Sequence, residues 1–211
     1  MYLPAEGTCC TEALQEQQIM ATTLAECIVE KLIAASVVEE VDRELYVYGF
    51  FLLITRFFFF LVTIAFGCLL GIPFESVIFY IAFFLLRSYA GGVHAKTEMA
   101  CTVWTMLALG TTVFAIRVRE FSSAEILLLL IFSNLSVFLF SPLDNIEKPL
   151  DADSRREYRK ICNILLIVYD VIAVISVLIR APALCYPVVC GLSLEGVLLS
   201  IGKVKGKEKD D

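Results

Sequence analysis

The chain has 211 residues, of which 59% are apolar and 19% are charged, and its mean hydropathy is +0.80. Soluble domains average about 45–50% apolar and about 25% charged residues, so this composition excludes a soluble globular domain and predicts a membrane protein. The net charge is −6, and most of the negative charge lies near the N-terminus. Residues 1–44 carry nine acidic and two basic side chains, whereas the rest of the chain carries 14 acidic and 15 basic side chains. No face is basic enough to predict binding of nucleic acid.

Residues 1–45 are predicted to form a cytoplasmic, amphipathic helical segment. Acidic side chains occupy one face of this segment, so it is not expected to bind anionic lipid. An apolar stripe on the other face would be uncovered in a monomer, which favours a homodimer. The stripe lies within residues 12–45 and has the three-and-four spacing of one helix face: Met20, Leu24, Ile28, Leu32, Ala35, Val38, Val41 and Leu45.

Residues 46–202 are predicted to be an all-α, polytopic membrane domain with about six transmembrane helices, because about 20 apolar residues cross a bilayer. With a cytoplasmic N-terminus, the inner segments hold 13 Lys and Arg residues and the outer loops hold three. The positive-inside rule therefore predicts a multi-pass protein of the cell membrane with both termini, including a charged tail at 203–211, in the cytoplasm. The apolar runs are about 46–71, 73–87, 98–116, 124–142, 161–179 and 182–201.

Four ionisable side chains lie within or at the edge of the predicted spans: Arg56, Glu75, Asp170 and Glu195. Such residues are costly in lipid and usually face a bundle interior or a partner. We expect an internal ion pair, for example of Arg56 with Asp170 or Glu195, in preference to a path for ions or peptide.

The eight cysteines include no C-x-x-C pair, and several lie inside apolar runs. Most are therefore predicted to be small core residues and not parts of disulfides. His94 is the only histidine, which excludes an H-E-x-x-H zinc protease. A zinc site formed by His94, Cys101, Cys162 and Cys27 remains an alternative, although these residues lack the paired spacing of structural zinc sites. We expect no metal and no cofactor.

The cytoplasmic loop at 87–101, with the sequence RSYAGGVHAKTEMAC, combines the residues that nucleophilic chemistry needs. Gly91 and Gly92 are expected to end the preceding helix and to allow close approach of the backbone. Thr97 is predicted to cap the next helix, which would place Cys101 at the end of its first turn. The partial positive charge at a helix N-terminus favours a thiolate there.

His94 and Cys101 are seven residues apart, which along one straight helix corresponds to about 10 Å. A nucleophile and its base need hydrogen-bonding contact, so chemistry requires His94 to lie in a loop folded back over Cys101, or a contact across a dimer. His94 would then take the thiol proton, and the thiolate would attack a peptide carbonyl. The spacing by itself leaves the function open, because buried cysteines often do no chemistry.

Two motifs in this order resemble the signature of the AgrB family, the membrane endopeptidases of Gram-positive quorum sensing. The first is an Arg, a Gly-Gly-x-His-Ala run and a Cys seven residues after the His; here these are Arg87, Gly91, Gly92, His94, Ala95 and Cys101. The second is the loop SPLDNIEKPLD, which resembles the family's Pro-x-Asp/Glu-x-x-x-Lys-Pro-Leu pattern through Pro142, Asp144, Lys148 and Pro149.

The resemblance implies a cysteine endopeptidase that cleaves an AgrD-type propeptide at its C-terminal side and yields a cyclic thiolactone or lactone peptide. It implies Cys101 as nucleophile and His94 as general base, at the cytoplasmic face of the bilayer. Arg87, Gly91, Gly92 and Lys148 would be supporting positions, and Lys148 would meet the acidic tail of the peptide. Asp144 or Asn145 could orient His94, although both residue types are also common in loop turns.

Two other functions remain open. A non-enzymatic scaffold or peptide exporter would lose its function when Asp170 or Glu195 is substituted, and would keep it without the Cys101 sulfur. The activity of the peptidase would suffer more from loss of the Cys101 sulfur than from substitution of Asp170 or Glu195. A thiol-dependent acyltransferase acting on lipid or protein is the third reading. A neighbouring reading frame for a short peptide with a central Cys or Ser and an acidic tail would favour the peptidase.

Overall fold

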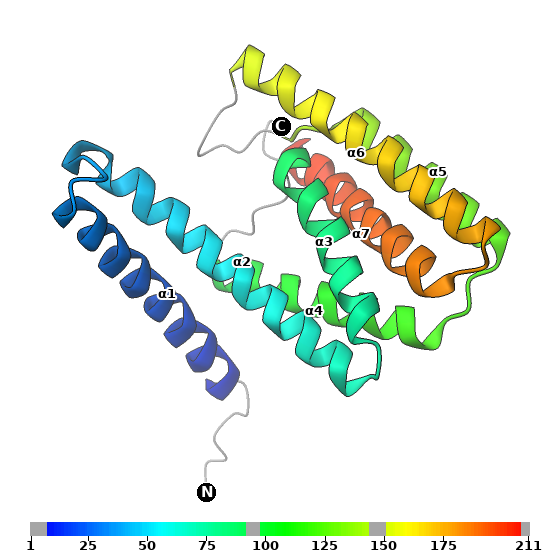
Figure 1. Ribbon diagram of the computed structural model, residues 1–211, viewed down its shortest axis with the longest axis horizontal. Helices are drawn as coiled ribbons and strands as arrows, with labels where there is room; N and C mark the ends of the chain where they lie inside the picture. The colour runs from blue at the N-terminus through cyan, green and yellow to red at the C-terminus, as the bar shows by residue number, and fades with distance from the viewer. Residues whose placement is uncertain (1–7, 92–97, 144–150, 208–211) are drawn as a thin grey trace, which may run out of the picture.

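The computed structural model describes residues 8–91, 98–143 and 151–207, and the side chains of 19–91, 102–143 and 151–204. Throughout these residues the regular structure is helical, which confirms the predicted all-α fold (Figure 1). The elements are α1 (Thr8–Ala34), η1 (Glu40–Asp42), α2 (Arg43–Leu69), α3 (Pro73–Ala90), α4 (Glu98–Val118), α5 (Ser123–Phe140), α6 (Ala152–Leu178) and α7 (Pro182–Lys207).

Helix α7 is the centre of the bundle and packs against α3, α5, α6 and α4. In its most apolar window 56% of the residues are buried, against 11% in α2 at the edge. Close packing depends on Gly191, where a Cβ would lie 3.2 Å from the Phe79 carbonyl oxygen of α3. Gly196 allows the same close approach to α5, because a Cβ at this position would lie 3.2 Å from Ser133 Cα. Small residues are the usual means by which membrane helices approach closely.

Among the described residues, five helices are long and apolar enough to cross a membrane, which supports a multi-pass membrane protein. They include α3, the counterpart of the short predicted run at 73–87, which has 18 residues. The sixth predicted run, 98–116, corresponds to α4, which has 21 residues and is apolar over Thr102–Val118, the part whose side chains are described.

The prediction of one helix over 12–45 is wrong, because α1 ends at Ala34 and α2 begins at Arg43. Ser36 has a φ of 56°, and its N–H donates to the Ile33 carbonyl at 2.8 Å. The Val37 N–H donates to the Leu32 carbonyl at 2.9 Å. This pair of hydrogen bonds is a Schellman C-cap, which usually uses glycine and here uses serine. The chain then turns back so that α1 packs against α2 (Figure 1).

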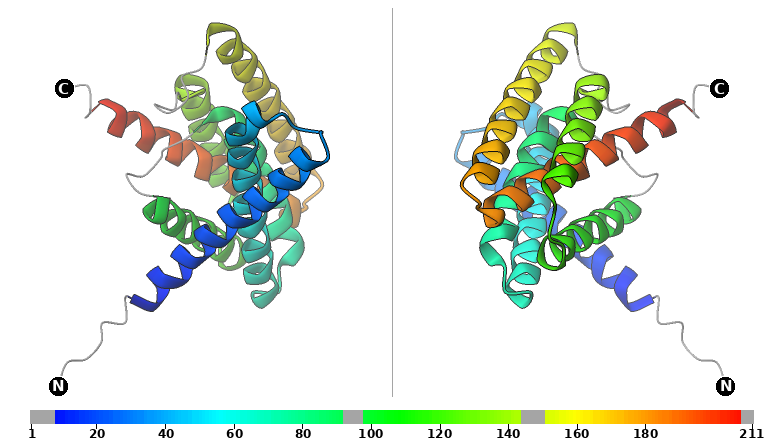
Figure 2. Two further views of the ribbon diagram at one scale, coloured as in Figure 1. Left: turned by 90° about the vertical axis from the view of Figure 1, so that its left-hand side faces the viewer. Right: turned by 90° about the vertical axis from the view of Figure 1, so that its right-hand side faces the viewer.

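The predicted apolar stripe is not the face of α1 that packs inside the chain. Ala21, Ala25 and Val29 are buried there, whereas the larger Met20 and Leu24 are 67% and 50% exposed. The smaller side chains allow the two helices to approach closely, so the larger ones point outward. Figure 2 shows that the beginning of α1 projects beyond the other helices.

Candidate functional site

The candidate site lies at the C-terminal end of α3, where Arg87 occupies the last turn of an otherwise apolar helix. Its Nη1 lies 3.5 Å from Oε1 of Glu195 on α7. The same nitrogen donates a hydrogen bond to the Gly91 carbonyl at 3.2 Å. The Arg87 side chain is 25% exposed and that of Glu195 is completely buried. One guanidinium therefore joins a buried carboxylate to the residue at which α3 ends.

Gly91 ends α3 with φ 78° and ψ −166°, a backbone region that is essentially restricted to glycine. The Leu143 N–H donates to the Ala90 carbonyl at 2.9 Å, so the segment after α5 is bonded to the end of α3. A Cβ on Gly91 would lie 2.5 Å from the Leu143 carbonyl oxygen. The contact therefore needs glycine for its backbone angles and for its lack of a side chain.

The segment after α5 is also tied to α6. The Ser141 hydroxyl donates to the Cys162 sulfur at 3.1 Å, and both side chains are buried. These contacts hold residues 141–143 between the end of α3 and the first half of α6. Residues of the two sequence motifs, Gly91 of the first and Pro142 of the second, are thereby brought to one end of the bundle.

Among the predicted site residues, Arg87 and Gly91 lie together at this end of α3. Cys101 lies in the first described turn of α4, and its side chain is outside the described part of the chain. The other candidates, Gly92, His94, Asp144 and Lys148, lie outside the described residues. Their roles remain predictions.

The predicted pairing of Arg56 with Asp170 or Glu195 is wrong. The Arg56 guanidinium carbon lies 5.1 Å from the ring centroid of Phe84. Asp170 accepts a hydrogen bond from the Asn134 side chain on α5 at 2.9 Å. Glu195 pairs instead with Arg87, at the start of the predicted cytoplasmic loop. The intramembrane charge of Glu195 was the available signal for a buried pair, but sequence separation could not indicate its partner.

The described residues do not assemble a zinc site. No group of three or more potential ligands occurs among them. Cys162 is buried on α6, whereas Cys27 is exposed on α1, and these helices lie on opposite sides of the molecule (Figure 1). The prediction of core cysteines is confirmed for Cys162, Cys185 and Cys190, while Cys68 is exposed on α2.

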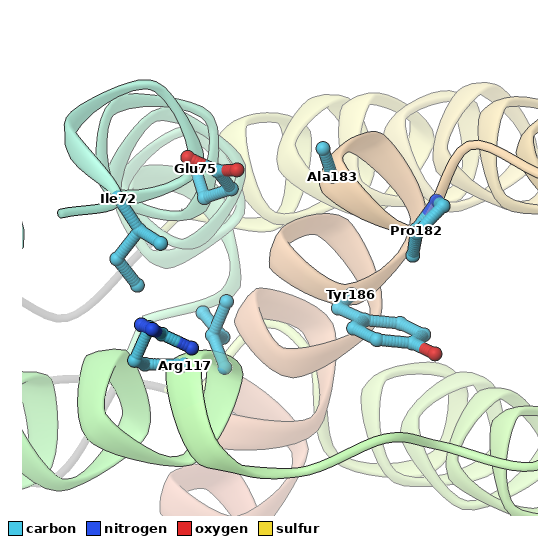
Figure 3. Close-up of a pocket in the computed structure, with 7 residues that line it drawn as sticks. Ile72, Glu75, Arg117, Pro182, Ala183 and Tyr186 are labelled. Carbon is cyan, nitrogen blue, oxygen red and sulfur yellow. The ribbon is translucent and has the colours of Figure 1, made fainter. Parts of the chain in front are cut away.

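A cavity of about 200 Å³ lies at the other end of the bundle (Figure 3). Its lining combines Glu75 at the start of α3 and Arg117 near the end of α4 with apolar residues of the first turns of α7. Glu75 and Arg87 are twelve residues apart on α3, which corresponds to about 18 Å along the helix. The cavity is therefore separate from the end of α3 where the two motif segments meet.

These features define a polytopic helical membrane protein with a buried ion pair beneath a junction of two loops. The family model described as Accessory gene regulator B matches residues 25–199, and the chain therefore belongs to the AgrB family.

Individual relatives agree with this assignment. The chain is 25% identical over 164 residues to AgrB-like protein 2 of Clostridium perfringens (strain 13 / Type A), covering 72% of this chain and 77% of that protein. It is 31% identical over 90 residues to accessory gene regulator protein B of Staphylococcus intermedius, covering 43% of this chain and 48% of that protein. No solved structure matches the chain.

Proposed function

We propose that this chain is a membrane cysteine endopeptidase that cleaves an AgrD-type propeptide at its C-terminal side. Membership of the AgrB family supports a role in accessory gene regulator quorum sensing. The observation that carries the proposal further is the contact between Gly91 and Leu143, because it joins the segments that lead into His94 and into Lys148. A peptidase needs its nucleophile, its base and its substrate-binding residues at one place.

The proposed reaction has two acyl-transfer steps. His94 takes the proton from the Cys101 thiol, and the thiolate attacks the scissile carbonyl carbon. The C–N bond then breaks, His94 returns the proton to the leaving amine, and the N-terminal part of the peptide remains as a thioester on Cys101. An internal thiol or hydroxyl of the peptide attacks this thioester, which releases a cyclic product and regenerates the Cys101 thiol. Exclusion of water by the headgroup layer would favour cyclisation over hydrolysis.

The supporting residues have two kinds of proposed role: some shape the backbone of the site, and others contact the peptide or His94. Arg87 and Gly91 set the path of the chain from α3 into the loop that carries Gly92 and His94. Lys148 is proposed to bind the acidic C-terminal part of the peptide, and Asp144 to orient His94.

Mass spectrometry of a candidate AgrD-type propeptide, co-expressed with this chain, tests the proposal. The intact protein is expected to release a C-terminal fragment and to leave an N-terminal product lighter than the linear one by one water. The Cys101→Ala variant is expected to leave the propeptide whole, because the acyl-enzyme cannot form. Cleavage that survives this substitution would refute the assignment of the nucleophile. A linear N-terminal product alone would refute cyclisation.

We further propose that both termini and the reaction site face the cytoplasm, on the basis of the distribution of Lys and Arg. Glu120, between α4 and α5, and Glu157, near the start of α6, are both exposed and lie toward opposite ends of the bundle. A membrane-impermeant maleimide added to intact cells should label a Glu120→Cys variant and spare a Glu157→Cys variant. The unsubstituted chain measures the background from native thiols. Labelling at position 157 with protection at 120 would reverse the proposed orientation.

We also propose a homodimer, because Met20 and Leu24 are exposed on α1, which is expected to lie outside the membrane. Light scattering in detergent, corrected for the bound detergent, should give twice the chain mass of 23.6 kDa. A monomeric mass across the accessible concentration range would contradict the dimer.

A further inference from the structure

Glu195 is a fully buried carboxylate on the central helix, 0% exposed. Both of its oxygens are buried without a hydrogen-bond partner among the described residues. Its charge is compensated by Arg87, at an N–O distance of 3.5 Å. Burying the carboxylate costs its solvation, and this cost can exceed its attraction to a guanidinium that is itself 25% exposed. A pair with one fully buried ion and such loose contacts is therefore a poor source of stability, and its presence needs another explanation.

The packing of α3 against α7 does not depend on this charge. Ala82, Leu86, Val188 and Leu192 belong to one buried apolar cluster shared by the two helices. Gly191 already brings the helices close, with a Cβ position 3.2 Å from the backbone of α3. The apolar contacts and the glycine are enough to account for the packing of α3 against α7. The role of the Glu195 charge is therefore to hold its partner, the Arg87 guanidinium, in place.

Arg87 transmits that effect to the end of α3. Its Nη1 is shared between the Glu195 carboxylate and the Gly91 carbonyl, at 3.5 Å and 3.2 Å. The Gly91 carbonyl belongs to the peptide that leads out of α3 toward the loop, and the neighbouring Ala90 carbonyl accepts the Leu143 N–H at 2.9 Å. The direction in which the chain leaves α3 is thus linked to a charge in the interior of α7.

We infer that Glu195 is a positioning residue for the proposed peptidase: its carboxylate holds the Arg87 guanidinium against the Gly91 carbonyl and so fixes the junction of the two motif loops. This inference rests on the proposed function. Neither sequence motif contains Glu195, which lies 108 residues after Arg87 in the chain. A small displacement of a reacting group can reduce a rate by about 100-fold, so a residue that acts only through another can have a large kinetic effect.

The test compares Glu195→Gln and Glu195→Asp with the wild-type chain, purified into lipid vesicles and supplied with the AgrD-type propeptide that the wild-type chain cleaves in the co-expression experiment. Glu195→Gln keeps the volume and removes the charge, and kcat is expected to fall by about 100-fold while KM changes by less than about threefold. Glu195→Asp keeps the charge and is expected to recover part of kcat. Asp170→Asn is the matched control, because it also converts an intramembrane carboxylate to an amide. Asp170 contacts Asn134 on α5 and not Arg87, so kcat should stay within about twofold of wild type.

Thermal unfolding of each variant separates positioning from folding. Glu195→Gln should keep a cooperative transition close to that of wild type, since Arg87 is partly exposed and can reach water. If Glu195→Gln does not fold, Arg87→Lys tests the same link, because lysine keeps the charge on a shorter side chain and so withdraws it from the Glu195 carboxylate and the Gly91 carbonyl. A folded variant of either kind with wild-type kcat would overturn the inference while leaving the proposed function intact. A wild-type chain that does not cleave the propeptide would instead refute the proposed function.

Discussion

Replacing His94 by alanine is expected to lower the rate of propeptide cleavage by about 10²–10⁴-fold, the usual contribution of a positioned general base. The physical reason is that the thiolate, and not the thiol, is the nucleophile, and His94 is the only histidine in the chain that can take the proton. Single-turnover kinetics with an AgrD-type propeptide that the wild-type chain cleaves would measure the acylation step directly.

A second readout of His94→Ala needs no substrate. Iodoacetamide reacts with thiolates, so its rate of reaction with Cys101 at neutral pH should fall by about tenfold or more in the His94→Ala variant. The tryptic peptide spanning 97–117 contains Cys101 as its single cysteine, which lets mass spectrometry follow this thiol among the eight in the chain. Cys68, exposed on α2, is the internal control and should react equally in both proteins. Unchanged alkylation and unchanged cleavage together would show that His94 is not the base.

Replacing Gly91 by alanine is expected to lower the free energy of unfolding by about 2–4 kcal/mol and to reduce cleavage strongly. Two costs add together at this position. The backbone angles of φ 78° and ψ −166° are unfavourable for any residue with a Cβ. The new Cβ would also lie 2.5 Å from the Leu143 carbonyl oxygen, so the segment at 141–143 would have to move away from α3.

Two other glycines separate these costs. Gly71→Ala imposes a positive φ of 74° with no atom within 4 Å of the new Cβ, so it measures the backbone cost alone. Gly110→Ala lies inside α4, also with no neighbour within 4 Å, and should be neutral or slightly stabilising. Chemical denaturation and the cleavage assay on all three variants give the comparison. If Gly91→Ala is no more harmful than Gly71→Ala, the contact with Leu143 does not hold the two loops together.

Much of the fold could be predicted because it depends on local properties of the chain. A membrane helix satisfies its own backbone hydrogen bonds, so the length and hydropathy of each run are enough to indicate it. This is why the short apolar run at 73–87, bounded by Pro73, is enough to predict the helix that the structure shows as α3. The two motifs were recognised for a similar reason, since residue types and spacing within a loop are local features. The roles of His94 and Cys101 stay predictions.

The break after α1 was missed because the Schellman turn uses Ser36 in place of glycine, so no breaker residue marked it. The buried face of α1 was also misassigned. A periodic pattern shows which side chains share a face, but the face that packs depends on the shape of the partner. Against α2, the small Ala21 and Ala25 fit where Met20 and Leu24 do not.

The sequence by itself determined the membrane class and most of the spans, because these follow from composition and local spacing. It also predicted the residues that could carry nucleophilic chemistry. Only the tertiary structure decided which charges meet. Glu195 could have paired with Arg56, but in the folded bundle it lies beside Arg87 instead. The meeting of Gly91 with Leu143 was decided in the same way. Such pairings depend on the relative rotation and height of whole helices, which are set by the packing of many side chains at once.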